Sequence, residues 1–183
     1  LNEKPIRLLG DSATYTCEIA RRLPGAPAVS AAVPSRPRSW RVRTGAARLA
    51  GDMAPGLVIE QVHEAAGLAD FERAASLGFG SPPGPAFTWH APPLLLDPRL
   101  QLWRGRLAGD TVAVSMGFAE AGVLGIYGVT TLPQYRRRGL GTALTRHALE
   151  GGPSLPAVLQ PSSMAEGLYG RLGFRRFTTF RAW

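Results

Sequence analysis

The chain has 183 residues, 45% of them apolar, which is enough for one folded domain with a buried core. Its single cysteine, Cys17, excludes an internal disulfide framework and a cysteine-based metal site, and the spacing of its three histidines gives no reason to expect a metal. The net charge of +8 admits nucleic acid as a partner, but every basic residue except Lys4 is arginine, which indicates a compositional bias rather than a binding surface.

Residues 1–50 are the least regular part of the chain, because prolines at positions 24, 27, 34 and 37 interrupt any long helix. We interpret them as an N-terminal arm or the remnant of a subdomain, followed by a domain over residues 51–183. The apolar stretch 112–132 contains Glu120, several glycines and many β-branched residues, so it indicates a strand hairpin rather than a membrane span. With no signal peptide in view, we expect a cytoplasmic protein without a membrane partner.

Regular elements begin at residue 57. A strand at 57–62 precedes a helix over 66–80, and the proline-rich stretch 81–98 predicts a long loop of the kind that often carries function. Three strands follow at 100–107, 111–119 and 123–132. Short turns with glycine separate them, so they predict an antiparallel meander.

The last third of the chain alternates helices with strands. We expect a helix from about Arg137 to residue 151, a short strand at 156–160, a helix over 162–172 and a final strand at 174–183. Ser163 and Glu166 have capping-box spacing, and Met164 begins the expected apolar stripe of that second helix. Because a strand–helix–strand unit normally pairs in parallel, we predict an α/β fold with a mixed sheet and helices on its faces.

The run R-R-R-G-L-G, Arg136–Gly141, lies at a predicted strand-to-helix turn. Unpaired N–H groups and the helix dipole make such a turn an anion site, and glycines let the backbone approach a phosphate closely. The spacing R-x-x-G-x-G matches neither the Walker loop nor the dinucleotide fingerprint. A solvated basic loop and a nucleic-acid patch remain alternatives, although three adjacent arginines do not spread over a face as a nucleic-acid patch does.

This motif has a second one downstream. The stretch "VTTLPQYRRRGLGTALTRHAL", followed by "AVLQPSSMAEGLYGRLGFRRF", resembles the GCN5-related N-acetyltransferase (GNAT) family over about residues 57–183 and most sharply over 124–176. The resemblance rests on R-x-x-G-x-G at a helix start and on L-Y-x-x-L-G-F in the next helix. It implies the acyl-CoA N-acyltransferase fold, with a mostly antiparallel sheet that splays between the fourth and fifth of the predicted strands.

The resemblance also implies a site for acetyl-CoA as cosubstrate, with no metal. Backbone groups of Val129 and Thr131, with Thr130 beside them, would pair with the pantetheine arm like an added strand. Ser162 and Ser163 match positions that contact CoA in the family, and they suit helix capping equally well. The pyrophosphate would lie against the loop and helix start formed by Arg136, Arg137, Arg138, Gly139, Leu140, Gly141 and Thr142.

Tyr169 matches the family tyrosine near the thioester sulfur, where a phenol can protonate the departing thiolate. The alternative is a core tyrosine, although Tyr169 is one residue off the apolar stripe. The strand over 123–132 has no carboxylate at the position of the general base found in many relatives, and Glu120 lies too far away. We therefore assign no base. Trp89, His90 and Tyr127 are candidates for the acceptor side, and a plain surface loop around the first two is the alternative.

The sequence thus predicts an N-acetyltransferase that moves the acetyl group of acetyl-CoA to a primary amine of a small molecule or peptide by direct attack. A non-catalytic acyl-CoA-binding module of the same fold is the second hypothesis, because the strand carboxylate is missing. Nucleic-acid binding is the third. Members of the family often dimerise, so the resemblance also implies a homodimer as one possible assembly.

Overall fold

The structure, a computed structural model, describes residues 38–44, 54–151 and 154–180. Its strands are β1 (Arg38–Arg43), β2 (Val58–Gln61), β3 (Leu100–Leu107), β4 (Asp110–Glu120), β5 (Val123–Thr131), β6 (Ala157–Leu159) and β7 (Arg175–Phe180). Its α-helices are α2 (Ala65–Gly78), α3 (Leu140–Gly151) and α4 (Glu166–Arg171), and its 3₁₀ helices are η1 (Pro92–Leu96), η2 (Pro133–Tyr135) and η3 (Ser163–Ala165). These bounds confirm the order of elements that the sequence predicts from residue 57 onward.

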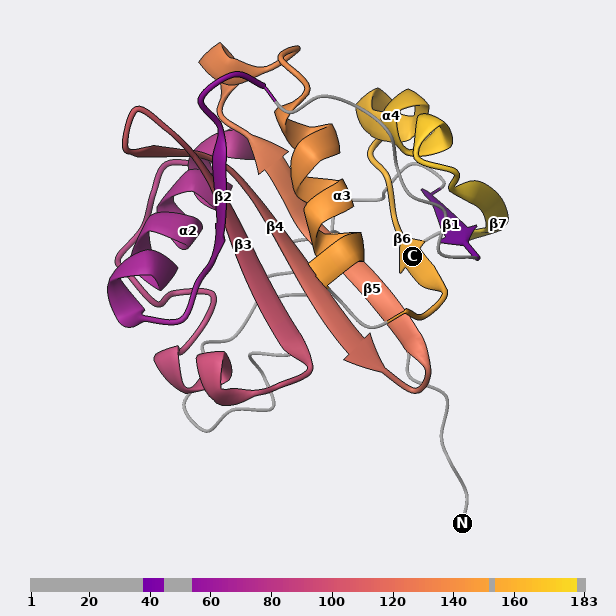
Figure 1. Ribbon diagram of the computed structural model, residues 1–183, viewed down its shortest axis with the longest axis horizontal. Helices are drawn as coiled ribbons and strands as arrows, with labels where there is room; N and C mark the ends of the chain where they lie inside the picture. The colour runs from indigo at the N-terminus through magenta and orange to yellow at the C-terminus, as the bar shows by residue number, and fades with distance from the viewer. Residues whose placement is uncertain (1–37, 45–53, 152–153, 181–183) are drawn as a thin grey trace.

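The strands form one seven-stranded sheet in the order β2-β3-β4-β5-β6-β1-β7 (Figure 1). Only β5 and β6 pair in parallel, which confirms a mixed and mostly antiparallel sheet. The predicted meander is present as β3, β4 and β5. Its two turns are Ala108-Gly109 and Ala121-Gly122, and all four residues have positive φ, as tight hairpin turns require.

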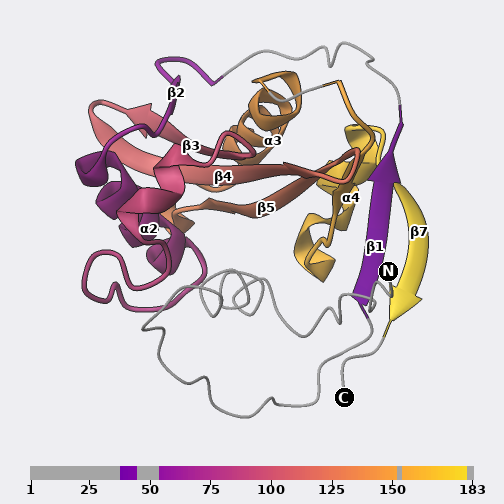
Figure 2. The same cartoon turned by 90° about the horizontal axis from the view of Figure 1, so that it is seen from below.

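Helices α2 and α3 lie on opposite faces of the sheet (Figure 2). Two clusters of buried side chains follow from this arrangement. The larger one includes Leu140 and Leu144 of α3, and the smaller one includes Leu68 and Phe71 of α2 with Met116 of β4. No helix in the described part of the chain is long and apolar enough to cross a membrane.

Strand β1 lies within the segment that the sequence suggested was an arm. It sits between β6 and β7 and pairs antiparallel with both. Four of its six residues are Arg38, Ser39, Arg41 and Arg43, so its composition gave no strand signal, and neighbouring prolines hid it further. The rest of the predicted arm, residues 1–37 and 45–50, lies outside the described residues.

The predicted capping box is wrong. Ser163 lies inside η3 rather than before a helix, and neither η3 nor α4 has a side-chain cap. The Glu166 carboxylate instead lies 3.3 Å from Arg41 of β1. Because η3 turns every three residues rather than every 3.6, Met164 leaves the apolar stripe and is 80% exposed.

The sheet opens between β5 and β6. The two strands pair only at Leu124–Ile126 against Ala157–Leu159, although β5 continues to Thr131. This confirms the splay expected between the fourth and fifth predicted strands. The second half of β5 therefore has an edge that β6 does not cover.

Candidate active site

Strand β5 carries a β-bulge directly beside the opening. Met116 of β4 lies opposite Tyr127 and Val114 lies opposite Thr130, so β5 takes three residue steps where β4 takes two. Gly128 lies inside the bulge with a φ of +59°, a left-handed conformation that glycine adopts at little cost. The extra residue reverses the side of the strand that each later backbone group faces.

The hydrogen bonds at the two ends of β5 demonstrate this reversal. The N–H of Leu124 donates to the carbonyl just before β6, whereas the N–H of Leu132 donates to a carbonyl of β4. Backbone direction alternates along a strand, so without the bulge both groups would face the same neighbour. Beyond the bulge, the N–H groups of Val129 and Thr131 therefore face the opening.

Thr130 faces away from the opening. Its buried side chain packs against Gly78 at the end of α2, so closely that a Cβ on that glycine would collide with it. Thr130 therefore holds α2 against β5, and of the three consecutive residues expected near the pantetheine arm only Val129 and Thr131 present backbone groups to the opening.

A pocket occupies the opening between β5 and β6. Tyr127, Val129, Ser162 and Tyr169, four of the predicted site residues, contribute to its wall. The complete lining is Phe79, Ile126, Tyr127, Gly128, Val129, Gln160, Ser162, Ala165 and Tyr169. The pocket thus joins the end of α2, the uncovered half of β5 and the α4 region.

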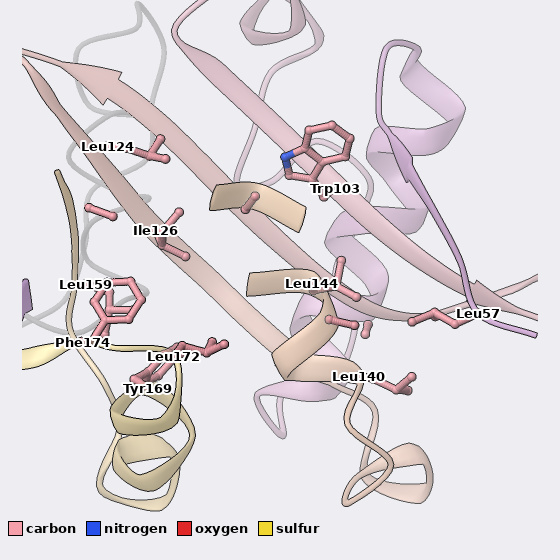
Figure 3. Packing of buried hydrophobic residues seen from close by; sticks show 14 of the residues in the cluster. Leu57, Trp103, Leu124, Ile126, Leu140, Leu144, Leu159, Tyr169, Leu172 and Phe174 are labelled. Atoms are coloured by element: carbon pink, nitrogen blue, oxygen red, sulfur yellow. The ribbon is translucent and has the colours of Figure 1, made fainter. Parts of the chain in front are cut away.

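Tyr169 reaches the pocket from α4 and is only 6% exposed. Its ring packs edge-to-face against Phe174, 5.9 Å between centroids, within the larger core cluster (Figure 3). Burial raises the pKa of Tyr169 to about 12, although a side-chain hydrogen bond with Thr145 acts in the opposite direction. The phenol therefore keeps its proton at neutral pH. It is more buried than its place beside the apolar stripe indicated.

Helix α3 begins three residues later than the sequence predicts, because the loop before it takes left-handed conformations. Arg137 has a φ of +64° and Gly139 a φ of +79°. The Ala143 N–H donates to the Gly139 carbonyl, so the N–H groups of residues 140–142 precede the hydrogen bonds of the helix. Such N–H groups, with the helix dipole behind them, favour a negatively charged group at the start of α3.

The three arginines of the loop have different surroundings. Arg136 donates to the last carbonyl of α2 at 2.7 Å and to the Thr131 carbonyl at 3.2 Å, so its charge ties the loop to α2 and β5. The Arg138 guanidinium lies 5.6 Å from the centre of the Tyr135 ring. The Arg137 side chain is exposed. The arginines at 137 and 138 are thus better placed than Arg136 to meet a phosphate.

Ser162 and Ser163 are both exposed, and only Ser162 lines the pocket. The Ala165 N–H donates to the backbone carbonyl of Ser162, and the Ser162 side chain makes no capping bond. The capping alternative is therefore wrong for these side chains.

The three predicted acceptor-side residues fall into two groups, because only Tyr127 lines the pocket. Tyr127 lines the pocket, where burial raises its pKa, and its ring lies over Gly125 so closely that a Cβ there would collide with it. His90 is buried outside the pocket lining, against the carboxylate of Glu72. Trp89 is partly buried and its N–H donates to the same carboxylate.

Sequence reasoning missed several residues of this region. Gly128 was passed over, although a glycine inside a strand pattern is the usual sign of a bulge. Phe79 and Gln160 line the pocket without any motif to mark them. Glu72 lies within the helix pattern of α2 and only its buried surroundings distinguish it. His147 packs edge-on against Trp103.

A family model described as "Acetyltransferase (GNAT) family" matches residues 69–174, which is more than half of the chain. The chain belongs to the GNAT family. The match spans α2 to the start of the last strand and includes both the opening of the sheet and the start of α3. GNAT proteins are acetyltransferases, so the family supports acetyl transfer as the general chemistry. A search of curated proteins finds no match.

Solved GNAT structures share this fold. A GCN5-related N-acetyltransferase from Kribbella flavida is 25% identical, with a TM-score of 0.60 over 80% of this chain and 57% of its own. One from Sphaerobacter thermophilus is 18% identical, with a TM-score of 0.65 over 81% of this chain and 51% of its own. The ribosomal-protein-S18-alanine N-acetyltransferase of Escherichia coli is 19% identical, with a TM-score of 0.53 over 67% of this chain and 79% of its own.

The chain spans only 57%, 63% and 51% of the lengths of the first three solved structures that it matches. Most of these proteins are longer than this chain, and the two with identities below 25% support the fold alone.

Proposed function

We propose that this protein is an N-acetyltransferase that transfers the acetyl group of acetyl-CoA to a primary amine by direct attack within a ternary complex. The observation that carries the proposal is the pocket in the opening between β5 and β6, which has Tyr169 in its wall. The uncovered edge of β5 leads from this pocket toward the anion site at the start of α3.

The residues of this chain fit the parts of acetyl-CoA. The N–H groups of Val129 and Thr131 would hold the amide groups of the pantetheine arm, as an added strand would. Those of residues 140–142, beside Arg137 and Arg138, would hold the pyrophosphate. A Cβ at Gly139 would meet no atom within 4 Å, so the space before α3 is open to a ligand. When bound, acetyl-CoA supplies the acetyl group as a reactive thioester.

The chain also supplies a proton donor for the leaving group of the reaction, the thiolate of CoA. With a pKa of about 12, the Tyr169 hydroxyl is protonated at neutral pH and has a proton to donate. It can donate this proton to a sulfur that leaves as a thiolate, a stronger base than the thioester it came from. The uncovered N–H groups of β5 are positioned to polarise a carbonyl that enters the pocket.

The acceptor is a small molecule or peptide that carries a primary amine. The solved neighbour from Escherichia coli is named for a protein acceptor, which keeps peptides within the proposal. The pocket lining contains no carboxylate and no imidazole, so the amine enters neutral or loses its proton through water. We further propose a cytoplasmic protein without metal, nucleic acid or membrane partners. The folded domain starts no later than β1, and a homodimer is its proposed assembly.

Thiol release measures the proposed activity directly. The full chain would be incubated with acetyl-CoA and, in turn, spermidine, tryptamine and a short peptide with an N-terminal alanine, and free CoA would be detected with a thiol reagent. Amine-dependent CoA release is the expected result. A thermal shift with acetyl-CoA that occurs without release by any amine would contradict the proposal.

That outcome would favour a second candidate, a non-catalytic acyl-CoA-binding module. The observation in its favour is the same pocket lining, which offers no group able to remove a proton from an ammonium ion. The two candidates differ at Tyr169. A binding module uses it only for packing, so Tyr169→Phe would leave all its properties nearly unchanged, whereas the enzyme would lose turnover.

A further inference from the structure

One buried carboxylate meets the middle of the loop that follows α2. The Glu72 Oε1 atom accepts the N–H of Trp89 at 2.9 Å and the N–H of His90 at 2.5 Å, and it lies 3.2 Å from Nδ1 of the His90 ring. The residues that meet are 17 and 18 positions apart, so this contact fixes the centre of the loop over residues 81–97 onto the helix.

This carboxylate is charged although it is buried. Burial alone would raise the pKa of Glu72, but the hydrogen bonds from the His90 side chain and from the two backbone N–H groups outweigh it and lower the pKa. Hydrogen bonds to a charged acceptor are about twice as strong as neutral ones. A neutral side chain of the same shape would hold the loop by packing and weaker hydrogen bonds. The charged carboxylate adds stronger hydrogen bonds, and so it stabilises the position of the loop further.

The surroundings of this contact carry further cost. The Glu72 Oε2 and the His90 Nε2 atoms are buried and have no hydrogen-bond partner in the described part of the chain. Just before the contact, Phe87 has a left-handed φ of +64° and is 40% exposed. An apolar pair would avoid the unpaired atoms and a relaxed loop would avoid the strain, so the contact holds the loop in a geometry that costs free energy.

The loop begins next to the α2 side of the pocket, although the residues that line the pocket lie outside the loop. It leaves the helix directly after Phe79, which lines the pocket. The His90 ring packs edge-on against Phe71, 5.7 Å between centroids. Tyr127, also in the pocket wall, packs against the cluster that contains Phe71. A shift of the loop would therefore be felt at the pocket wall through contiguous side chains.

We propose that Glu72 is a positioning residue that latches the loop over residues 81–97 to α2. Through the packing of Phe71 and Tyr127, this latch holds the α2 side of the pocket in the geometry that receives the amine. The inference rests on the proposed function and deepens it, because it divides the site in two. Acetyl-CoA depends on β5 and α3, and the amine depends on the Glu72 latch.

The latch is tested on the full chain with Glu72→Gln, which keeps the shape but removes the charge, and with Glu72→Ala, which removes the acceptor. Asp70→Asn is the matched control, because Asp70 lies on the same helix and pairs at 3.3 Å with an arginine on the exposed side. His90→Ala keeps both backbone bonds to the carboxylate and removes only the ring. Thermal melting establishes that each variant is folded.

Chymotrypsin supplies a readout that does not need activity, because Phe87 and Trp89 are cleavage sites inside the loop. We expect cleavage there to be about tenfold faster in Glu72→Ala, somewhat less accelerated in Glu72→Gln and His90→Ala, and unchanged in Asp70→Asn, since local opening governs cleavage. Equal rates in wild type and both Glu72 variants would overturn the latch.

Steady-state kinetics with the best of the three probe amines tests the role of the latch. In Glu72→Gln we expect the KM for the amine to rise about tenfold, which corresponds to about 1.4 kcal/mol, and the KM for acetyl-CoA to stay within about twofold. Faster cleavage with an unchanged amine KM would overturn the acceptor role. If wild type transfers no acetyl group, the proposed function and the acceptor role fail together, while cleavage still decides whether the latch exists.

Discussion

The two sides of the pocket are built by different means. The proposed cosubstrate side consists of backbone groups, namely the uncovered edge of β5 and the N–H groups of residues 140–142. The proposed amine side is supported by side chains that meet from distant positions, as Glu72 and His90 do. Backbone chemistry at a turn is encoded by a few adjacent residues, whereas a contact between distant side chains exists only after folding. Substitutions can separate the two sides experimentally.

The largest effect is expected at the point where the two sides meet. Tyr169→Phe removes the proton donor but leaves the ring packed, so kcat should fall by about a hundredfold or more while the affinity for acetyl-CoA is unchanged. Turnover and a CoA-binding titration would measure the two quantities. Normal turnover in this variant would show that Tyr169 only supports the core. The two proposed sides of the pocket would then have no catalytic group between them.

The pKa of Tyr169 gives the second prediction. The unfolded chain loses the phenol proton near pH 10 and the folded chain near pH 12, so the folding stability carried by this group is full below pH 10 and is lost as the pH rises to 12. The loss should be of the order of 2 kcal/mol. Denaturant titrations between pH 9 and 12 would show a steeper decline in wild type than in Tyr169→Phe. Identical declines would mean that the phenol is not buried in solution.

Substitutions at Gly139 and Arg138 compare how much backbone geometry and side-chain charge each contribute to the affinity for CoA. Gly139→Ala places a side chain on a residue with φ of +79°, which costs about 1 kcal/mol and disturbs the N–H groups after it, so the Kd for CoA should rise about tenfold. Arg138→Ala removes one exposed charge and should raise it about threefold. Calorimetry with CoA would rank the two. A larger effect of Arg138→Ala would show that charge, rather than backbone, dominates this side.

The smallest effect is expected at Gly125. An alanine there would collide with the Tyr127 ring, so the ring must move and the KM for the amine should rise a few-fold. Tyr127→Ala in the same chain removes the collision, and the double variant should therefore be less impaired than the two single changes predict together. Strict additivity in this double-mutant cycle would indicate that the contact is relaxed in solution.

The sequence predicted most of the fold, and for the candidate site it predicted the glycine-rich turn before α3. Gly139 and Gly141 disclosed the start of α3 because a short run of residues defines both the turn and the phosphate chemistry. The sequence did not disclose the bulge at Gly128, whose effect depends on the register against β4. It did not disclose β1, since β1 is a strand by virtue of its two neighbours. The surroundings of Glu72 were equally out of reach, because His90 must fold back onto α2.

The position of β1 has a consequence for how the protein is made. Ribosomes release residues 38–43 before any other described strand, yet both partners of β1, residues 157–159 and 175–180, are synthesised after all the other described strands. The sheet therefore cannot be completed until residues up to 180 have emerged, and contacts this distant in sequence form slowly. A fragment that begins at residue 51 would carry two exposed strand edges in place of β1 and should aggregate during expression.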